Sequence, residues 1–349
     1  MPPAFRPTQR VCVGRFFDAI ARPMPLAFVT CFAFLSSHYT PTVPNPAPVS
    51  SSLDDYLIPP LPSSLAQVLS IVSNNAQDQA TRPITEAVAS DPALSAYVLR
   101  RVNSPYYGVS RHVESVEKAV RLLGGKTVCE IALEAGLRQV FPYMETAAAQ
   151  NVYTAVMQGS IMTAHLAQAV ADALHVPHYQ QAYLAGLLQQ VGRLVLLQQK
   201  PQAYAAVWYG LSEDAQAEDA HSLVCPSRAD EQQAIGIDYV ATGRKVAAHW
   251  HLPTVVQACI RYQHAPDEVV HVPYRPIVHV TRVANLWAYH AILDALPADE
   301  PPSLSDAPPA FTDALQALAH LRKKSPEDLF DLIASRQADA LEAVTFRTG

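Results

Sequence analysis

The stretch Tyr183–Leu197, which reads YLAGLLQQVGRLVLL, constrains the fold of this chain more than any other. Its nearly unbroken apolar character indicates a buried helix, a break at glycine and a second apolar run. The amide pair Gln189-Gln190 lies in the middle of this frame. Glycine is scarce, at 12 residues, alanine and leucine are plentiful, and alternating Val/Ile/Thr runs are few. We therefore expect an all-α fold.

Length and composition set the broad class of the protein. A chain of 349 residues that is 50% hydrophobic and 16% charged can build one large domain or two modest ones. The net charge of −6 and the lack of a basic stripe give no electrostatic case for nucleic-acid binding. The cysteines form no CxxC pair, so we expect neither a zinc site nor a disulfide framework, and we expect Cys129 and Cys259 to pack as small hydrophobes. This usage suits a reducing, cytoplasmic compartment.

The N-terminal region has more than one reading. Several arginines precede an apolar run, Pro25–Leu35, which resembles a signal peptide but is too short to span a membrane as a helix. The alternative is a poorly ordered leader over residues 1–52, or an upstream start codon with Met24 as one candidate for the true start. We favour the leader or misassigned start, and we expect no membrane span.

Start and stop signals divide the rest of the chain into helices. Ser64 and Gln67 predict a capping box, Asp91-Pro92 predicts an N-cap followed by a first-turn proline, and Ser115 predicts another N-cap. Gly124-Gly125 predicts a helix end before the next helix, Lys126–Phe141. Later helices are expected over Tyr153–Leu174, Tyr179–Gln199, Ala229–Ile235, Val240–Trp250, Thr254–His264 and Ile277–Leu296, followed by a Pro/Ser/Asp-rich linker, Pro297–Pro309, and amphipathic C-terminal helices.

An ordered set of motifs resembles the HDOD family, the HD-related output domains of bacteria. The set is Ser90-Asp91-Pro92-Ala93-Leu94, Val102-Asn103-Ser104, Tyr106-Tyr107-Gly108, Leu122-Leu123-Gly124, Tyr183–Leu197 and His249–Pro253. The resemblance covers roughly residues 55–345. It implies an HDOD domain over residues 53–345: an N-terminal helical bundle over 53–145, packed on an HD-like helical domain over 150–297, with a linker and C-terminal helices over 298–349.

The resemblance also locates the positions where HD enzymes hold catalytic metal. In this chain they are occupied by Gly159, Gln189, Gln190, Tyr239, Gln263, His264 and Asn285. Only His264 keeps a ligand-type side chain, and a catalytic zinc site needs at least three protein ligands. We expect no metal and no cofactor. The amides could line a polar pocket for a nucleotide or another small ligand, or satisfy one another where a metal would sit.

Loss of these ligands predicts a non-catalytic signalling or regulatory module that acts through contacts with signalling proteins. One alternative is a metal-free sensor with a nucleotide or another small ligand in the vestigial pocket. The other is a residual HD-type phosphohydrolase, which we disfavour because water activation needs a coordinated metal. Aromatic residues that could contact a partner, or could instead pack between the helical blocks, are Tyr106, Tyr107 and Trp208.

Overall fold

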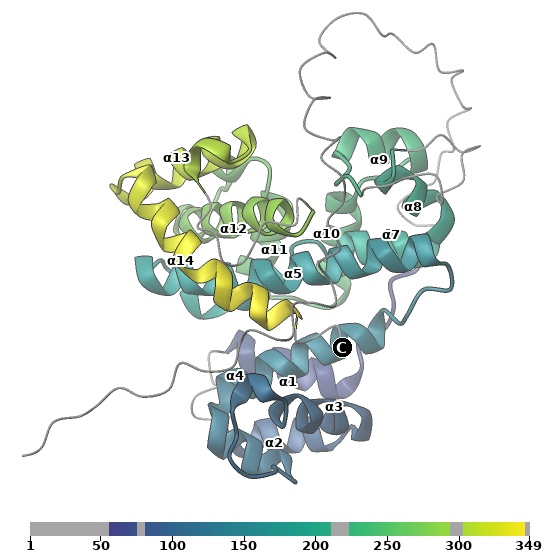
Figure 1. The fold of residues 1–349 in the computed structure, drawn as a ribbon. Coiled ribbons are helices and arrows are strands. Elements are labelled where there is room, and N and C mark those ends of the chain that lie inside the picture. The colour runs from purple at the N-terminus through teal and green to yellow at the C-terminus, as the bar shows by residue number, and fades with distance from the viewer. Residues whose placement is uncertain (1–55, 75–80, 211–222, 294–302, 346–349) are drawn as a thin grey trace, which may run out of the picture. The chain divides into compact units, whose positions relative to one another are not determined.

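The computed structural model describes residues 56–74, 81–210, 223–293 and 303–345. Within these ranges the regular secondary structure is helical and there is no strand, which confirms the all-α prediction (Figure 1). The expected leader over residues 1–52 and much of the linker expected at Pro297–Pro309 lie outside the described residues. No helix in the described part of the chain is both long enough and apolar enough to cross a bilayer.

The N-terminal helices form a bundle whose starts are set by side-chain caps. The helices are α1 (Ser63–Ser73), α2 (Thr81–Ala89), α3 (Pro92–Val102) and α4 (Val116–Val140). Asp91 caps α3 by accepting from the amides of Ala93 and Leu94, and Ser115 caps α4 through Lys118 N, both as expected. The capping box expected at Ser64 is wrong, because α1 already begins at Ser63 and the Ser64 hydroxyl donates instead to Asp91 Oδ2 at 3.1 Å.

Gly124 changes the direction of α4 rather than ending it with a loop. Its backbone has φ 83° and ψ 159°, outside the helical region, while the helix continues on both sides. An L side chain is disfavoured at this φ, so glycine is the residue that permits the kink. The expected stop at Gly124-Gly125 is therefore a kink between two helical segments, and the predicted Lys126–Phe141 helix is the second of them.

The remaining helices surround α5 (Ala147–Leu174) and α12 (Arg275–Leu293), which pack against each other. They are α6 (Ala182–Leu188), α7 (Val191–Gln199), α8 (Pro201–Trp208), α9 (Arg228–Ile235), α10 (Tyr239–His249), α11 (Thr254–Arg261), α13 (Pro309–Arg322) and α14 (Pro326–Thr345). Short 3-10 turns lie at Pro105–Tyr107, Tyr179–Gln181, Pro266–Glu268, Val272–Tyr274 and Leu304–Asp306. Cys129 and Cys259 are buried free thiols, as expected.

The apolar run Tyr183–Leu197 is buried throughout and breaks at the amide pair itself. Gln189 and Gln190 separate α6 from α7, whereas Gly192 lies inside α7, so the expected break at glycine is corrected. Gly192 serves close packing instead: a Cβ there would lie 2.0 Å from Tyr239 O and 2.7 Å from Gly243 N. Because α7 and α10 cross at this point, the sequence brings the amide pair against the start of α10.

Polar contacts also join the N-terminal helices to the later ones. Gln181 Nε2 donates to Ser73 O at 2.8 Å, and Trp250 Nε1 donates to Pro59 O at 3.0 Å. The Tyr183 hydroxyl donates to the buried carboxylate of Glu134. These bonds connect segments far apart in sequence, so the two sets of helices share polar contacts as well as the hydrophobic core.

Candidate functional site

Gln190 lies at the centre of a hydrogen-bonded cluster formed by four helical segments. Its Nε2 donates to Gln263 Oε1 at 3.2 Å and to Asn285 Oδ1 at 3.1 Å, and its Oε1 accepts from Arg193 Nε at 2.7 Å. The side chain is 2% exposed. An amide has two donor hydrogens and one carbonyl oxygen, and here each has a protein partner. The Gln190 amide is therefore satisfied without a ligand.

Gln263 extends the same cluster from the end of α11. Its Nε2 donates to Ile260 O at 2.9 Å and to Gln189 O at 3.4 Å. Its Oε1 also lies 3.1 Å from the Tyr239 hydroxyl, which in turn lies 2.7 Å from His264 Nε2. The structure thus brings Gln190, from the junction of α6 and α7, together with Tyr239 of α10, Asn285 of α12, and Gln263 and His264 of the turn after α11.

Gly159 and Gln189 flank this cluster without joining it through their side chains. A Cβ at Gly159 would lie 2.7 Å from the ring of Tyr289, so the tyrosine fills the space beside that glycine. Gln189 contributes its backbone carbonyl to Gln263, but both polar atoms of its buried side chain lack a hydrogen-bond partner within the described residues. A buried amide without partners is energetically unfavourable, which makes Gln189 the exception among the clustered amides.

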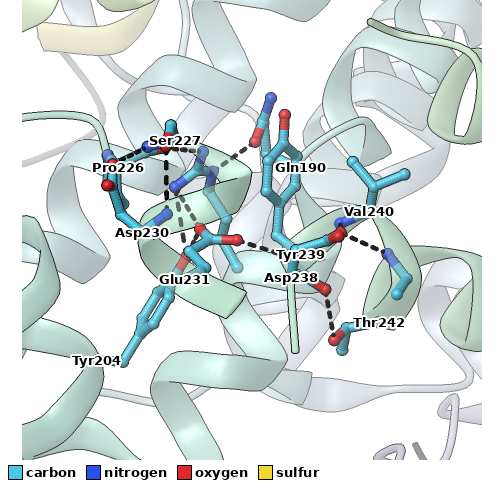
Figure 2. Close-up of polar contacts among 12 residues, drawn as sticks. Gln190, Tyr204, Pro226, Ser227, Asp230, Glu231, Asp238, Tyr239, Val240 and Thr242 are labelled. Atoms are coloured by element: carbon cyan, nitrogen blue, oxygen red, sulfur yellow. Dashed lines mark hydrogen bonds and ion pairs between the residues drawn. The ribbon is translucent and has the colours of Figure 1, made fainter. Parts of the chain in front are cut away.

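A buried ion pair supports the cluster from the α7 and α9 side. Arg193 Nη1 lies 2.8 Å from Glu231 Oε1, and the two side chains are 3% and 0% exposed. Arg193 Nη2 donates to Pro226 O at 3.0 Å, and the guanidinium carbon lies 4.0 Å from the centre of the Tyr239 ring. The labelled residues Gln190, Pro226, Glu231 and Tyr239 lie close together in Figure 2. The charge of Arg193 is therefore neutralised and its donors are engaged.

Glu231 fixes both the arginine and the start of α10. Oε1 accepts from the Tyr204 hydroxyl at 2.7 Å, and Oε2 accepts from the backbone amide of Tyr239 at 2.7 Å. Burial raises the pKa of Glu231, while Arg193, Tyr204 and the Tyr239 amide oppose that rise. A carboxylate that pairs with a permanently charged guanidinium and accepts these donors is well placed to remain ionised.

Helix caps hold the elements that present these groups. Ser227 and Asp230 form a capping box at the start of α9, the helix that carries Glu231 (Figure 2). Asp238 caps α10 by accepting from Val240 N at 2.8 Å and Ala241 N at 2.9 Å, and it pairs with Arg228 at 2.8 Å. The caps fix where α9 and α10 begin, and therefore where Glu231 and Tyr239 lie relative to Arg193.

The environment keeps both His264 and Tyr239 uncharged near neutral pH. His264 as a whole remains exposed, but partial loss of water around its ring, together with the nearby guanidinium groups of Arg228, Arg282 and Arg193, lowers its pKa to about 4. Burial raises the pKa of Tyr239 to about 12. A neutral imidazole can accept from a neutral phenol, in agreement with the short contact between the two side chains.

The residues at the ligand-type positions offer little to a divalent cation. The described residues contain no group of three or more His, Cys, Asp or Glu side chains placed to hold a metal. An ion entering the cluster would meet amides, a phenol and one imidazole. Carboxylates, imidazoles and thiolates are the usual protein ligands of catalytic metals. The donor set therefore does not fit a catalytic metal.

Sequence reasoning missed Arg193, Glu231 and Tyr204. A charged residue inside the apolar run Val191–Leu197 was the available signal, since an arginine in such a run needs a buried partner. For Trp208 the sequence leaves partner contact and packing open, and because the side chain is 0% exposed the structure favours packing. Tyr106 and Tyr107 are half-buried and pack edge-to-face, with ring centroids 4.8 Å apart.

Comparison with known proteins decides the family. The model of the HDOD domain matches residues 58–266, which is more than half of the chain. The chain belongs to the HDOD family. An uncharacterized protein of Treponema pallidum (strain Nichols) is 25% identical over 251 residues, or 71% of this chain. The HDOD chain spans only 45% of that relative's length.

Solved structures share the fold of this HDOD chain. An HDOD domain protein of unknown function from Geobacter sulfurreducens has a TM-score of 0.59 at 19% identity, covering 83% of this chain and 92% of the other. A candidate phosphohydrolase from Shewanella amazonensis SB2B has a TM-score of 0.57 at 22% identity, covering 84% and 96%. A candidate signal transduction protein from Marinobacter aquaeolei VT8 has a TM-score of 0.59 at 22% identity, covering 85% and 60%. At these identities the likeness concerns the fold alone.

Proposed function

We propose that this HDOD chain is a non-catalytic regulatory module that acts through contacts with signalling proteins. The observation that carries the proposal is the chemistry of the clustered ligand-type positions. Gln190, Gln263 and Asn285 hydrogen-bond within the cluster, and His264 is the one ligand-type side chain among the positions that the resemblance marks. Phosphoester hydrolysis on this frame would need a metal to activate water, and the cluster does not provide the ligands.

A hydrolysis assay tests the catalytic half of the proposal. Purified protein is incubated with Mn²⁺, Mg²⁺, Fe²⁺ or Zn²⁺ and with bis-p-nitrophenyl phosphate or cyclic dinucleotides, beside an active HD phosphohydrolase. We expect the rate to equal that of buffer with the same metal. Metal-dependent turnover that falls to background in His264→Gln would contradict the proposal, since it would place a functional metal at the cluster.

A second candidate function rests on Gln189. Its buried side-chain amide lacks hydrogen-bond partners within the described residues, and a small ligand with a donor and an acceptor would satisfy it. The chain would then be a metal-free sensor of a nucleotide or a similar molecule. A thermal-shift screen against nucleotides tests this candidate, because a ligand that binds the folded state raises the melting temperature by mass action. A rise seen in the wild type and lost in Gln189→Leu would favour the sensor.

A further inference from the structure

A groove distinct from the amide cluster lies between α10 and α11. It encloses about 640 Å³ and is closed on one side by the segment 262–274. Small residues at Ala241, Ala247 and Ala258 form part of its lining, and Thr254 and Gln257 lie along α11. None of the clustered ligand-type residues lines the groove.

Among the described residues, the lining of the groove includes Arg244, Lys245 and Arg261 but no Asp or Glu. Arg244 and Arg261 are exposed, and no ion pair engages either guanidinium within the described ranges. The Lys245 ammonium donates to Tyr56 O at 3.2 Å, so it is held in place at the groove. The chain as a whole carries a net charge of −6, so an acidic partner would be attracted to this cationic groove rather than to the rest of the surface.

An apolar ridge borders the same groove. Val270, which lines it, is 86% exposed, and nearby Val272 is 60% exposed. The ridge is held in shape, since Arg275 Nε donates to Val269 O at 3.2 Å and the Tyr274 hydroxyl lies 2.9 Å from Thr254 Oγ1. The ring of Tyr274 packs against His271, with centroids 4.2 Å apart. Exposed aliphatic side chains on a fixed ridge beside charged residues are typical of a protein contact surface.

The conformation of the occupant follows from backbone hydrogen bonding. The described helices present no strand edge at the groove, so an extended peptide would find no backbone ladder to join. A helix satisfies its own backbone groups, so it can cover the apolar ridge without such a ladder. We propose that this groove binds an acidic amphipathic helix of a signalling partner, with its apolar stripe on Val270 and its carboxylates on Arg244 and Arg261. This rests on the proposed function and names the surface that would perform it.

A displayed helix library tests the inference. Its members are helices of about four turns with leucine fixed at i, i+3, i+4 and i+7 spacing and with Glu, Asp, Gln or Ala elsewhere. A matched library replaces Glu and Asp by Lys and Arg. Clones are selected on the full-length protein, and their affinity is measured by fluorescence anisotropy. We expect binders from the acidic library only, with affinity that falls as salt rises.

Charge-reversed variants locate the bound helix. Arg244→Glu and Arg261→Glu should each weaken binding about tenfold or more, and Val270→Asp should weaken it as well. Arg121→Glu is the control, because that exposed arginine lies on α4 and does not line the groove. Circular dichroism melting verifies that the variants fold, and Arg244→Gln, which should bind with intermediate affinity, replaces Arg244→Glu if that variant does not.

Three results would overturn the inference. These are an acidic library without binders, binders that tolerate both arginine reversals, and a nucleoside triphosphate that displaces every binder and binds the groove more tightly. None of these results would indicate catalysis at the amide cluster, because they concern binding at the groove, whereas the hydrolysis assay measures activity at the cluster. Failure of this surface is thus distinguishable from failure of the proposed function.

Discussion

At the scale of single residues, Arg193 holds the amide cluster together. It contacts Gln190, Glu231, Tyr204 and the ring of Tyr239, all within the protein interior. A buried ion pair contributes little net stability compared with a packed hydrophobic pair, but loss of one partner leaves an uncompensated charge. The Arg193–Glu231 ion pair therefore adds little to the free energy of unfolding, but it restricts which side chains can replace either residue.

Removal of the guanidinium should be strongly destabilising. We expect Arg193→Met to lower the free energy of unfolding by about 3–5 kcal/mol, because Glu231 stays buried without its counter-charge. Arg193→Met combined with Glu231→Leu should recover part of that loss. Urea denaturation measures all three proteins, with Arg82→Met on the exposed surface of α2 as a control expected to stay close to wild type. Equal stability of Arg193→Met and wild type would show that the pair is not needed.

His264 makes stability depend on pH. Its pKa is about 4 in the folded protein against an ordinary value of 6.5, so the unfolded chain binds the proton more tightly. Stability from the neutral ring is fully present above pH about 6.5 and is lost as the pH falls toward 4. Burial also lowers the pKa of His279, which acts in the same direction. We expect the urea midpoint to fall from pH 7 to pH 5 and His264→Gln to reduce that fall.

The control for this pH dependence is His112→Gln, which changes an exposed histidine outside the cluster. We expect it to keep the wild-type slope. If His264→Gln and wild type lost stability in parallel between pH 7 and pH 5, His264 would not be held neutral by its surroundings.

At the scale of elements, the crossing of α7 and α10 positions the site. A Cβ at Gly192 would lie 2.0 Å from the backbone oxygen of Tyr239, whereas a Cβ at Gly243 would lie 3.1 Å from the Ile260 side chain. Backbone cannot move aside as a side chain can, so Gly192→Ala should lower the free energy of unfolding by about 1–3 kcal/mol or more. Gly243→Ala should be nearly neutral, because alanine also favours the helix. Guanidinium denaturation compares the two, and similar losses would contradict the tight crossing.

Helix existence was predictable from the sequence, but helix boundaries and long-range pairing were less so. Caps at Asp91 and Ser115 and the period of the apolar residues identify α3 and α4 because these signals are local. The Ser64 capping box failed because a nearby partner, Asp91, takes the hydroxyl. The Arg193–Glu231 pair joins residues on different helices, and no local pattern in a sequence shows which buried charges meet. Motif resemblance supplied the positions of the amide cluster that local patterns could not.

At the scale of the whole molecule, the N-terminal and later helices should unfold together. Hydrogen bonds such as Gln181 to Ser73 O and Trp250 to Pro59 O cross between them, and the core is continuous. Trp208 and Trp287 lie in the later helices, whereas Trp250 contacts Pro59 and Phe141, so fluorescence reports mainly the later helices while far-ultraviolet circular dichroism reports the whole chain. We expect coincident urea transitions by the two probes. A separate early transition seen only by circular dichroism would show that the N-terminal helices unfold on their own.

The most direct test of a non-catalytic cluster is its metal content. The protein is stripped with a chelator, dialysed against Mn²⁺, Fe²⁺ or Zn²⁺ near neutral pH and analysed by inductively coupled plasma mass spectrometry, with His264→Gln in parallel. Because the cluster offers amides and a phenol beside a buried guanidinium, we predict no stoichiometric metal and no difference between the two proteins. One bound metal per wild-type chain, lost in His264→Gln and accompanied by phosphoester hydrolysis, would contradict the central claim.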